Sequence, residues 1–190
     1  MNKIKSVSCL FRYLFIIGLI AWPVWILTFW ISNGYAFLFG HTAMITYVGV
    51  ETYPWLEHTK NLPAVTSLTD GVKTIAATIS FIPTLIEMAV FYFLIRLFRL
   101  YEEARIFTTE NVHYIRLTGL MIFLSQIILP FYEALMTFVL TSHNPVGKHF
   151  ITISFGNGNI KILIIALLIM LIAWIMDEGR KIQDEQQLTV

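Results

Sequence analysis

Two carboxylates stand in otherwise apolar stretches, each shortly after a proline: PTLIE ends at Glu87, and PFYE ends at Glu133. An ionised side chain at the centre of a bilayer costs about 3 kcal/mol on insertion scales, so such a residue normally faces other helices and has a partner. Prolines at positions 83 and 130 each free a backbone carbonyl one turn earlier, which a polar side chain or water satisfies. These stretches are the strongest candidates for chemistry in the chain.

Helical spacing gives each glutamate an uncharged polar neighbour. Ser80, Thr84 and Glu87 share one face of a helix, and Gln126 and Glu133 share a face of another. If the two helices run antiparallel, Gln126 lies level with Glu87, and Glu133 lies between Ser80 and Thr84. Protonated glutamates would then hydrogen-bond between helices, or the pair would respond to protons or cations. A hydrolase is not indicated, because no nucleophile, oxyanion donor or metal ligand set accompanies them.

The composition indicates that these helices lie in a membrane. The 190 residues are 57% hydrophobic and only 13% charged, whereas soluble domains carry about 25% charged residues. A net charge of +1 does not indicate a nucleic-acid-binding protein. The single cysteine, Cys9, excludes an internal disulfide and a cysteine-rich metal site, and we expect a free thiol near the interface.

Four apolar stretches of about 20 residues predict four membrane-spanning helices. They lie at residues 13–31, 74–98, 117–140 and 160–176. We therefore expect a single all-α transmembrane domain over residues 1–190, folded as a four-helix bundle. A signal peptide is not expected at the first stretch, because its apolar segment is too long and no small-residue cleavage site follows.

Lysine and arginine predict the orientation of this bundle. With four spans, nine of these residues share one side: Lys3, Lys5, Arg12, Arg96, Arg99, Arg105, Arg116, Arg180 and Lys181. Four share the other side: Lys60, Lys73, Lys148 and Lys161. Because basic residues favour the cytoplasm, we expect both termini, the loop 99–116 and the tail 177–190 to be cytoplasmic. The segments 32–73 and 141–159 then form the extracytoplasmic loops.

One apolar segment complicates the count of spans. Residues 34–50 are apolar apart from His41, so a re-entrant segment or a fifth span is an alternative. We favour an extracytoplasmic position, because TAMITYVGVETY is rich in β-branched and aromatic residues, and Phe150–Phe155 alternates in polarity. Both segments fall in the outer loops, which predicts a small β-cap on that side.

The same outer loops contain the residues that most resemble metal ligands. They are His41, His58, His143, His149, Glu51, Glu57 and Asp70. None has the spacing of a known ligand pair, so we expect solvated loops, with a cation site as the less favoured alternative. No cofactor is predicted. The glycines of SFGNGN precede an apolar span and indicate a turn, not a phosphate-binding loop.

The inner loop and the tail show clear helix signals. Thr108 is a plausible N-cap, with Glu110 and Asn111 in the turn that follows, so the third helix would begin before the membrane. We expect Val112, Ile115 and Arg116 to face its neighbours. The tail places three oppositely charged pairs four residues apart, which predicts that the fourth helix continues into the cytoplasm. They are Asp177 with Lys181, Arg180 with Asp184, and Lys181 with Glu185.

These two segments resemble a known family. The pattern IFTTENVHYIRLTG before an apolar span, and the ending EQQLTV, are similar to the bacterial membrane-protein family designated domain of unknown function 2975. The matching residues are Phe107, Thr108, Glu110, Asn111, Val112, Ile115, Arg116, Gly119, Leu188, Thr189 and Val190. Ala104 stands where the family pattern has a glycine, at a tight turn. The resemblance extends from the first span to the last residue and implies four spans with cytoplasmic ends and no established catalytic residues. Members often resemble partners of small helix-turn-helix regulators.

Two functions from different classes remain open. The first is a non-enzymatic protein of the bacterial inner membrane that senses or transmits a signal by docking a cytoplasmic partner, such as a helix-turn-helix regulator. Its docking residues would be Phe107, Thr108, Glu110, Asn111, Arg116, Leu188, Thr189 and Val190. The alternative is a small proton-coupled transporter or permeation unit that acts as a homo-oligomer around Glu87 and Glu133. A membrane enzyme is a third, weakly supported reading.

Overall fold

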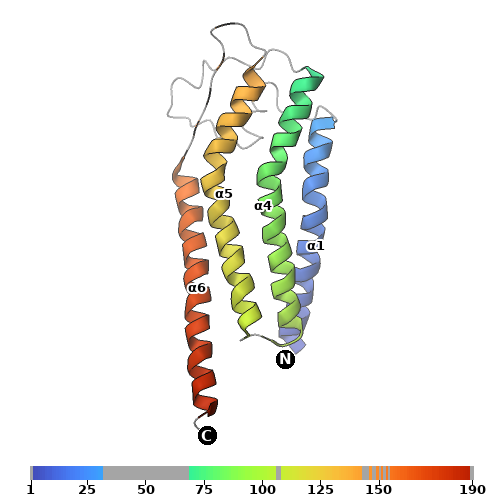
Figure 1. Cartoon of the computed structure of the whole chain (residues 1–190). Helices are drawn as coiled ribbons and strands as arrows, with labels where there is room; N and C mark the ends of the chain where they lie inside the picture. The colour runs from blue at the N-terminus through green and yellow to red at the C-terminus, as the bar shows by residue number, and fades with distance from the viewer. Residues whose placement is uncertain are drawn as a thin grey trace. The chain divides into compact units, whose positions relative to one another are not determined.

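A computed structural model of the chain describes residues 2–31, 69–105, 108–142, 146, 149, 151, 153 and 155–188. The described residues form four helices, labelled as in Figure 1: α1 is Asn2–Ile31, α4 is Asp70–Glu102, α5 is Thr109–Thr141 and α6 is Asn157–Leu188. No strand occurs among these residues. The all-helical class predicted from the sequence is confirmed.

Each helix is long and apolar enough to cross a membrane. The helices have 30, 33, 33 and 32 residues, which corresponds to about 45–50 Å at about 1.5 Å per residue. The hydrocarbon layer of a bilayer is only about 30 Å thick. Each predicted span lies within one of these longer helices, and four helices of this length and composition indicate an integral membrane protein.

The chain divides into two compact units. The first unit comprises Met1–Ala21, Leu85–Gln126 and Asn157–Val190, and the second unit comprises Trp22–Thr84 and Ile127–Gly156. Helices α1, α4 and α5 contribute to both units, whereas the whole of α6 belongs to the first. The division falls within a few residues of Pro23, Pro83 and Pro130, one in each shared helix. A proline interrupts the backbone ladder of a helix, so a change of packing partners at these points is expected.

Aromatic contacts join α1 to α4 within the first unit. The rings of Phe11 and Phe98 are stacked with centroids 5.3 Å apart, and the Phe15 and Phe98 centroids are 5.5 Å apart. Farther along α1, a Cβ atom at Gly18 would lie 3.3 Å from the Phe91 ring. The helices therefore pack through aromatic side chains of both helices and, at Gly18, through a small residue of α1 against a ring of α4.

Figure 1 shows α5 next to α6, and within the first unit the two helices approach each other closely at Gly119. A Cβ atom added there would lie 2.8 Å from Met170 Cγ and 3.2 Å from the carbonyl oxygen of Ala166. Only glycine leaves room for this backbone-to-backbone approach. Small residues at helix contacts are typical of membrane proteins, in which van der Waals packing drives association.

Helix α6 buries only a narrow stripe. Its buried residues Asn159, Ala166 and Ala173 recur every seven positions, the spacing of a seam along one helix face. The exposed apolar side chains of α6 include Ile164, Ile165, Leu167, Leu168, Leu171, Ile172, Trp174 and Ile175. Such a surface is far more apolar than that of a soluble protein and suits contact with lipid.

The second unit has an apolar core of its own. Phe29 and Trp30 of α1, Val72 and Ala76 of α4, and Tyr132, Met136 and Leu140 of α5 form one buried cluster. The Trp30 Nε1–H donates a hydrogen bond of 3.1 Å to Ser80 Oγ. A buried indole N–H needs such a partner, so this bond fixes one contact between α1 and α4.

The turn after α4 is a Schellman motif. Its two diagnostic bonds run from the Arg105 N–H to the Leu100 carbonyl, at 2.9 Å, and from the Ala104 N–H to the Tyr101 carbonyl, at 3.1 Å. Ala104 adopts a left-handed conformation, with φ of 59°, which usually requires glycine. The tight turn therefore forms although alanine stands at the position where the family pattern has glycine.

The start of α5 agrees with the sequence. Thr108 Oγ1 accepts a hydrogen bond of 3.3 Å from the Asn111 N–H, and the Thr108 carbonyl accepts the Val112 N–H at 3.2 Å. Thr108 is thus the N-cap, as predicted. Val112 is buried and Ile115 is half-buried, but Arg116 is exposed. The expectation that Arg116 faces a neighbouring helix is therefore wrong, because its long side chain extends towards solvent beside the buried stripe.

Several predictions fall outside the described residues. They are the apolar segment 34–50, the TAMITYVGVETY strand and the histidines at positions 41, 58 and 143. Of the segment 150–155, positions 151, 153 and 155 are described, and none lies in a strand. The β-cap and the orientation of the termini stay predictions.

Candidate functional site

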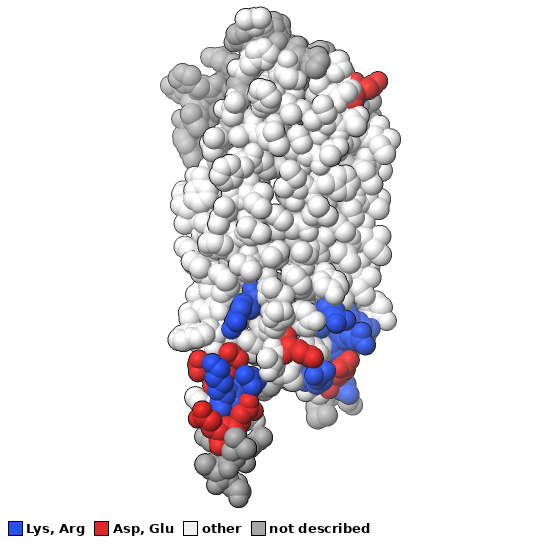
Figure 2. Space-filling model, viewed as in Figure 1, with Lys and Arg blue, Asp and Glu red and all other residues white. Residues whose placement is uncertain are grey.

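Charged side chains of the first unit gather at one end of its helices (Figure 2). We call this cluster the charged end. It consists of Arg12, Arg96, Arg99, Glu102, Glu103, Arg105, Glu110, Asp177, Glu178, Arg180, Lys181 and Asp184. Every helix contributes to it, so it is the first candidate for a functional surface.

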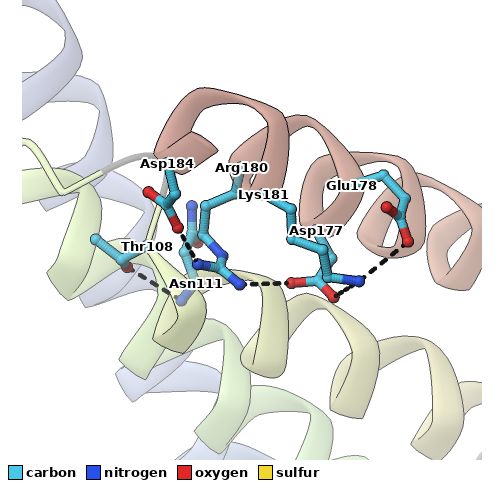
Figure 3. A network of polar contacts seen from close by, with 7 residues as sticks. All are labelled: Thr108, Asn111, Asp177, Glu178, Arg180, Lys181 and Asp184. Atoms are coloured by element: carbon cyan, nitrogen blue, oxygen red, sulfur yellow. Dashed lines mark hydrogen bonds and ion pairs between the residues drawn. The ribbon is translucent and has the colours of Figure 1, made fainter. Parts of the chain in front are cut away.

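The last turns of α6 carry a ladder of ion pairs (Figure 3). The Arg180 guanidinium bridges two carboxylates, with Nη1 at 2.7 Å from Asp184 and Nη2 at 3.3 Å from Asp177. The Lys181 ammonium lies 3.0 Å from Glu178 and 3.5 Å from Asp177. The predicted pairs Asp177–Lys181 and Arg180–Asp184 are confirmed, whereas the pair Lys181–Glu185 stays a prediction. These contacts hold the tail of α6 in a helical conformation beyond its apolar segment.

The start of α5 lies next to this ladder. Asn111 is completely buried, and Figure 3 shows Thr108 and Asn111 beside Arg180 and Asp184. The close contact at Gly119 places Ala166 opposite it. Because the two helices run antiparallel, residues that precede Gly119 on α5 lie beside residues that follow Ala166 on α6. Two predicted docking residues, Thr108 and Asn111, therefore lie next to the last turns of α6.

Two further contacts link helices at the charged end. Arg96 Nε on α4 donates a hydrogen bond of 3.2 Å to the Tyr114 hydroxyl on α5, and the guanidinium lies 5.9 Å from the Tyr114 ring centroid. Arg12 Nη1 on α1 lies 2.7 Å from Glu102 Oε2 on α4. Neither pair was predicted. Partners 18 and 90 positions apart give no periodic signal, although Arg12, Arg96 and Glu102 all interrupt or flank apolar runs.

The remaining predicted docking residues are placed only in part. Glu110 is exposed in the first turn of α5, and its carboxylate lies 3.1 Å from Arg105. Leu188 is the last helical residue of α6. Phe107, Thr189 and Val190 lie outside the described residues. Their role in docking stays a prediction.

The second unit contains the second candidate site, a set of buried polar residues. Ser80, Thr84, Glu133 and Thr137 are all less than 4% exposed. The hydroxyls bond to their own helices: Ser80 donates to the Ala76 carbonyl, Thr84 to the Ser80 carbonyl and Thr137 to the Glu133 carbonyl, at 2.7–2.9 Å. Glu133, at 2% exposed, is buried in the same unit as these hydroxyls.

Glu87 and Gln126 belong to the first unit. Glu87 is half-buried, whereas Gln126 is buried and its amide Nε2 donates a hydrogen bond of 3.2 Å to Ser125 Oγ. The predicted hydrogen bonds from Glu87 to Gln126, and from Glu133 to Ser80 and Thr84, stay predictions. The helix faces themselves agree with the sequence, since these polar residues are turned away from the exposed apolar surface.

Within the part of the chain that the structure describes, no group of three histidine, cysteine or acidic residues is arranged to hold a metal ion. His149 Nδ1 lies 2.7 Å from the Thr141 carbonyl oxygen, so this ring contacts the end of α5. Cys9 is half-buried and is not in a disulfide.

The family described as protein of unknown function (DUF2975) matches residues 51–190 of the chain. This region includes α4, α5 and α6, the buried polar residues of the second candidate site and all of the charged end except Arg12, whereas the resemblance expected for the first span lies outside it. No curated protein and no solved structure shows significant similarity to the chain.

Proposed function

The chain belongs to the DUF2975 family, and we infer that it is a non-enzymatic membrane protein which transmits a signal to a cytoplasmic partner. The family description assigns no function, so the inference depends on the structure of the charged end. Its central observation is the continuity of α6. One helix, Asn157–Leu188, runs without an internal proline from an apolar segment into an ion-paired tail.

A continuous helix is a suitable mechanical connection. The apolar part of α6 contacts α5 at Gly119, and the tail lies next to the N-cap of α5 (Figure 3). A rotation or shift of α6 would therefore change the surface formed by Thr108 and the tail, and the packing around the buried Asn111. Shifts of packed helices by 1–2 Å are a common switching movement.

The surface at this end suits a protein partner. It presents both signs of charge at Arg180, Lys181 and Asp184, and its exposed residues include Ile182. Charges of both signs around an apolar residue favour oriented docking of a complementary protein surface. A basic helix-turn-helix regulator is the kind of partner that the tail would recognise through its carboxylates.

The experiment is affinity purification from native membranes of the organism. We compare the wild type, a truncation that lacks Gln186–Val190, and the ladder variant Arg180→Ala. Equal abundance of all three in the membrane is the control, since these residues lie beyond the apolar core. We expect the wild type to retain a DNA-binding regulator that the truncation loses. If the truncation retains the same partner, or the wild type yields only copies of itself, the proposal is wrong.

The burial of Glu133 supports a second function, a proton-responsive transporter or permeation unit. Glu133 is only 2% exposed within a helix that is apolar enough to cross a membrane, and intramembrane carboxyls often belong to proton relays. Four spans are few for a pathway, so this function requires a homo-oligomer. Its test is proton flux into liposomes, which Glu133→Gln would abolish and Glu87→Gln would reduce if both residues take part.

A further inference from the structure

The charged end contains a pocket that the proposed function does not use. Its volume is about 260 Å³, and it lies between the last turns of α4 and the first turns of α5. The polar side chains that line it are those of Arg96, Arg99, Glu103, Arg105, Glu110 and Tyr114. All of them belong to the first unit. Three guanidinium groups around one cavity indicate a site for an anion.

The two carboxylates of the pocket are already occupied by two of the arginines. Glu103 lies 3.4 Å from Arg99 and 3.7 Å from Arg105, and Glu110 lies 3.1 Å from Arg105. Three positive and two negative groups leave a formal charge of +1. Among the described residues, Arg96 has no carboxylate within ion-pair distance. The excess positive charge is therefore centred on Arg96.

The Arg96 guanidinium is held in a defined orientation. Its Nε–H donates to the Tyr114 hydroxyl at 3.2 Å, and its plane lies near the Tyr114 ring. This bond uses the Nε–H and leaves the N–H groups of both Nη atoms available to a ligand in the pocket that Arg96 lines. A planar guanidinium with two available N–H groups binds phosphate or carboxylate in a bidentate way. Because the Arg96 side chain is already restricted by this contact, it loses less conformational entropy when a ligand binds.

The backbone positions the opposite wall. The Schellman turn, with Ala104 in the left-handed conformation, reverses the chain directly after α4. This reversal brings Arg105 towards Glu110 on α5, at 3.1 Å. Arg105 and Arg96 are thereby placed on two sides of one cavity although nine positions separate them. The volume of about 260 Å³ is below the range of about 300–1,000 Å³ that drug-sized ligands occupy, so a small anionic group is the fitting occupant.

We propose that this pocket binds a phosphate-type oxyanion, with Arg96 as the principal ligand and Arg105 as the second. The oxyanion comes either from the headgroup of an anionic phospholipid or from a soluble phosphate compound. Its position at the end of the apolar part of α4 makes the headgroup accessible from the bilayer. The proposal does not depend on a protein partner at the tail of α6.

The test uses the full chain in nanodiscs. One set contains phosphatidylcholine alone and is titrated with inorganic phosphate at constant ionic strength, with sodium chloride as the control. The other set contains phosphatidylcholine with phosphatidylglycerol, and native mass spectrometry measures the retained phosphatidylglycerol. The variants are Arg96→Gln and the matched control Arg116→Gln, which removes one exposed arginine outside the pocket. Arg105→Gln, at an exposed position, replaces Arg96→Gln if the latter does not fold.

In at least one set, we expect the wild type to bind its probe and the Arg96→Gln protein to bind the same probe with an affinity lower by about tenfold or more. A hydrogen bond to a charged group accounts for about a tenfold change in affinity or more. The Arg116→Gln protein should bind like the wild type. Loss confined to phosphatidylglycerol identifies a lipid headgroup, and loss confined to inorganic phosphate identifies a soluble ligand. The proposal is overturned if the wild type binds neither probe, or if both variants bind like the wild type.

Discussion

Polar side chains are stabilised in opposite ways at the charged end of the first unit and among the buried polar residues of the second unit. At the charged end, nearly all charges are paired at 2.7–3.7 Å and remain in contact with solvent. In the second unit, the hydroxyls of Ser80, Thr84 and Thr137 bond to backbone carbonyls of their own helices. Glu133 is the one carboxylate buried among them in the described residues.

Under the proposed function, the charged end serves docking, whereas the buried polar residues of the second unit are compatible with a stable apolar core. Exposed ion pairs contribute little to folding, so they are retained for specificity or docking more readily than for stability. Hydroxyls that bond to their own helix hide their polarity from the apolar surroundings. The comparison predicts that substitutions at close helix contacts change the free energy of unfolding strongly, and that substitution of the buried carboxylate changes it little.

The largest expected effect is at Gly119, in the contact between α5 and α6. Gly119→Leu should lower the free energy of unfolding by about 2–3 kcal/mol, because the added side chain meets Met170 and the Ala166 carbonyl and must push the helices apart. The measurement is thermal unfolding in detergent. Gly179→Ala is the control, since its added Cβ meets nothing within 4 Å, and it should stabilise α6 by up to about 1 kcal/mol. Equal stability of the Gly119→Leu protein and the wild type would show that the helices do not meet there.

A smaller change in the free energy of unfolding, of opposite sign, is expected for a substitution in the turn between α4 and α5 at the charged end. Ala104→Gly should raise the free energy of unfolding by about 1 kcal/mol, because a left-handed conformation costs an L-residue about 1–2 kcal/mol and glycine almost nothing. Denaturant unfolding of the wild type and the variant measures the change. Destabilisation by the glycine would mean that position 104 is not left-handed.

The smallest effect is expected at the buried carboxylate of the second unit. Glu133→Gln keeps shape and hydrogen-bonding capacity, so the stability should change by no more than about 0.6 kcal/mol, the average worth of an interhelical hydrogen bond in a membrane. Thermal unfolding between pH 5 and 8 should give the same pH slope for both proteins, with Glu87→Gln measured alongside. A slope in the wild type that disappears in either variant would show that the carboxyl group titrates, and would favour the transporter.

Much of the fold could be predicted from local patterns. Apolar length identified four helices that could span a membrane. The N-cap at Thr108 and two of the three predicted pairs in the tail followed from residue type and spacing. The burial of Ser80, Thr84 and Glu133 followed from helical periodicity. These features depend on residues within one or two turns of each other, where the sequence carries a direct signal.

Contacts between helices were not predictable in the same way. The bond from Trp30 to Ser80 and the ion pair of Arg12 with Glu102 join residues 50 and 90 positions apart. No periodicity relates such partners, because their meeting depends on helix packing. The pocket around Arg96 was also missed, since its arginines were counted only as markers of orientation, and its shape depends on the turn at Ala104.

The most direct test of the account is the side of the membrane that the charged end faces. In a Cys9→Ser background, single cysteines are introduced by Val146→Cys and Ile182→Cys, at positions that are 99% and 55% exposed. A membrane-impermeant maleimide is added to intact bacterial cells and, as a control, to permeabilised cells. We predict that the Val146→Cys protein reacts in both, and that the Ile182→Cys protein reacts only after permeabilisation. Rapid reaction of the Ile182→Cys protein in intact cells would place the charged end outside and contradict a cytoplasmic partner.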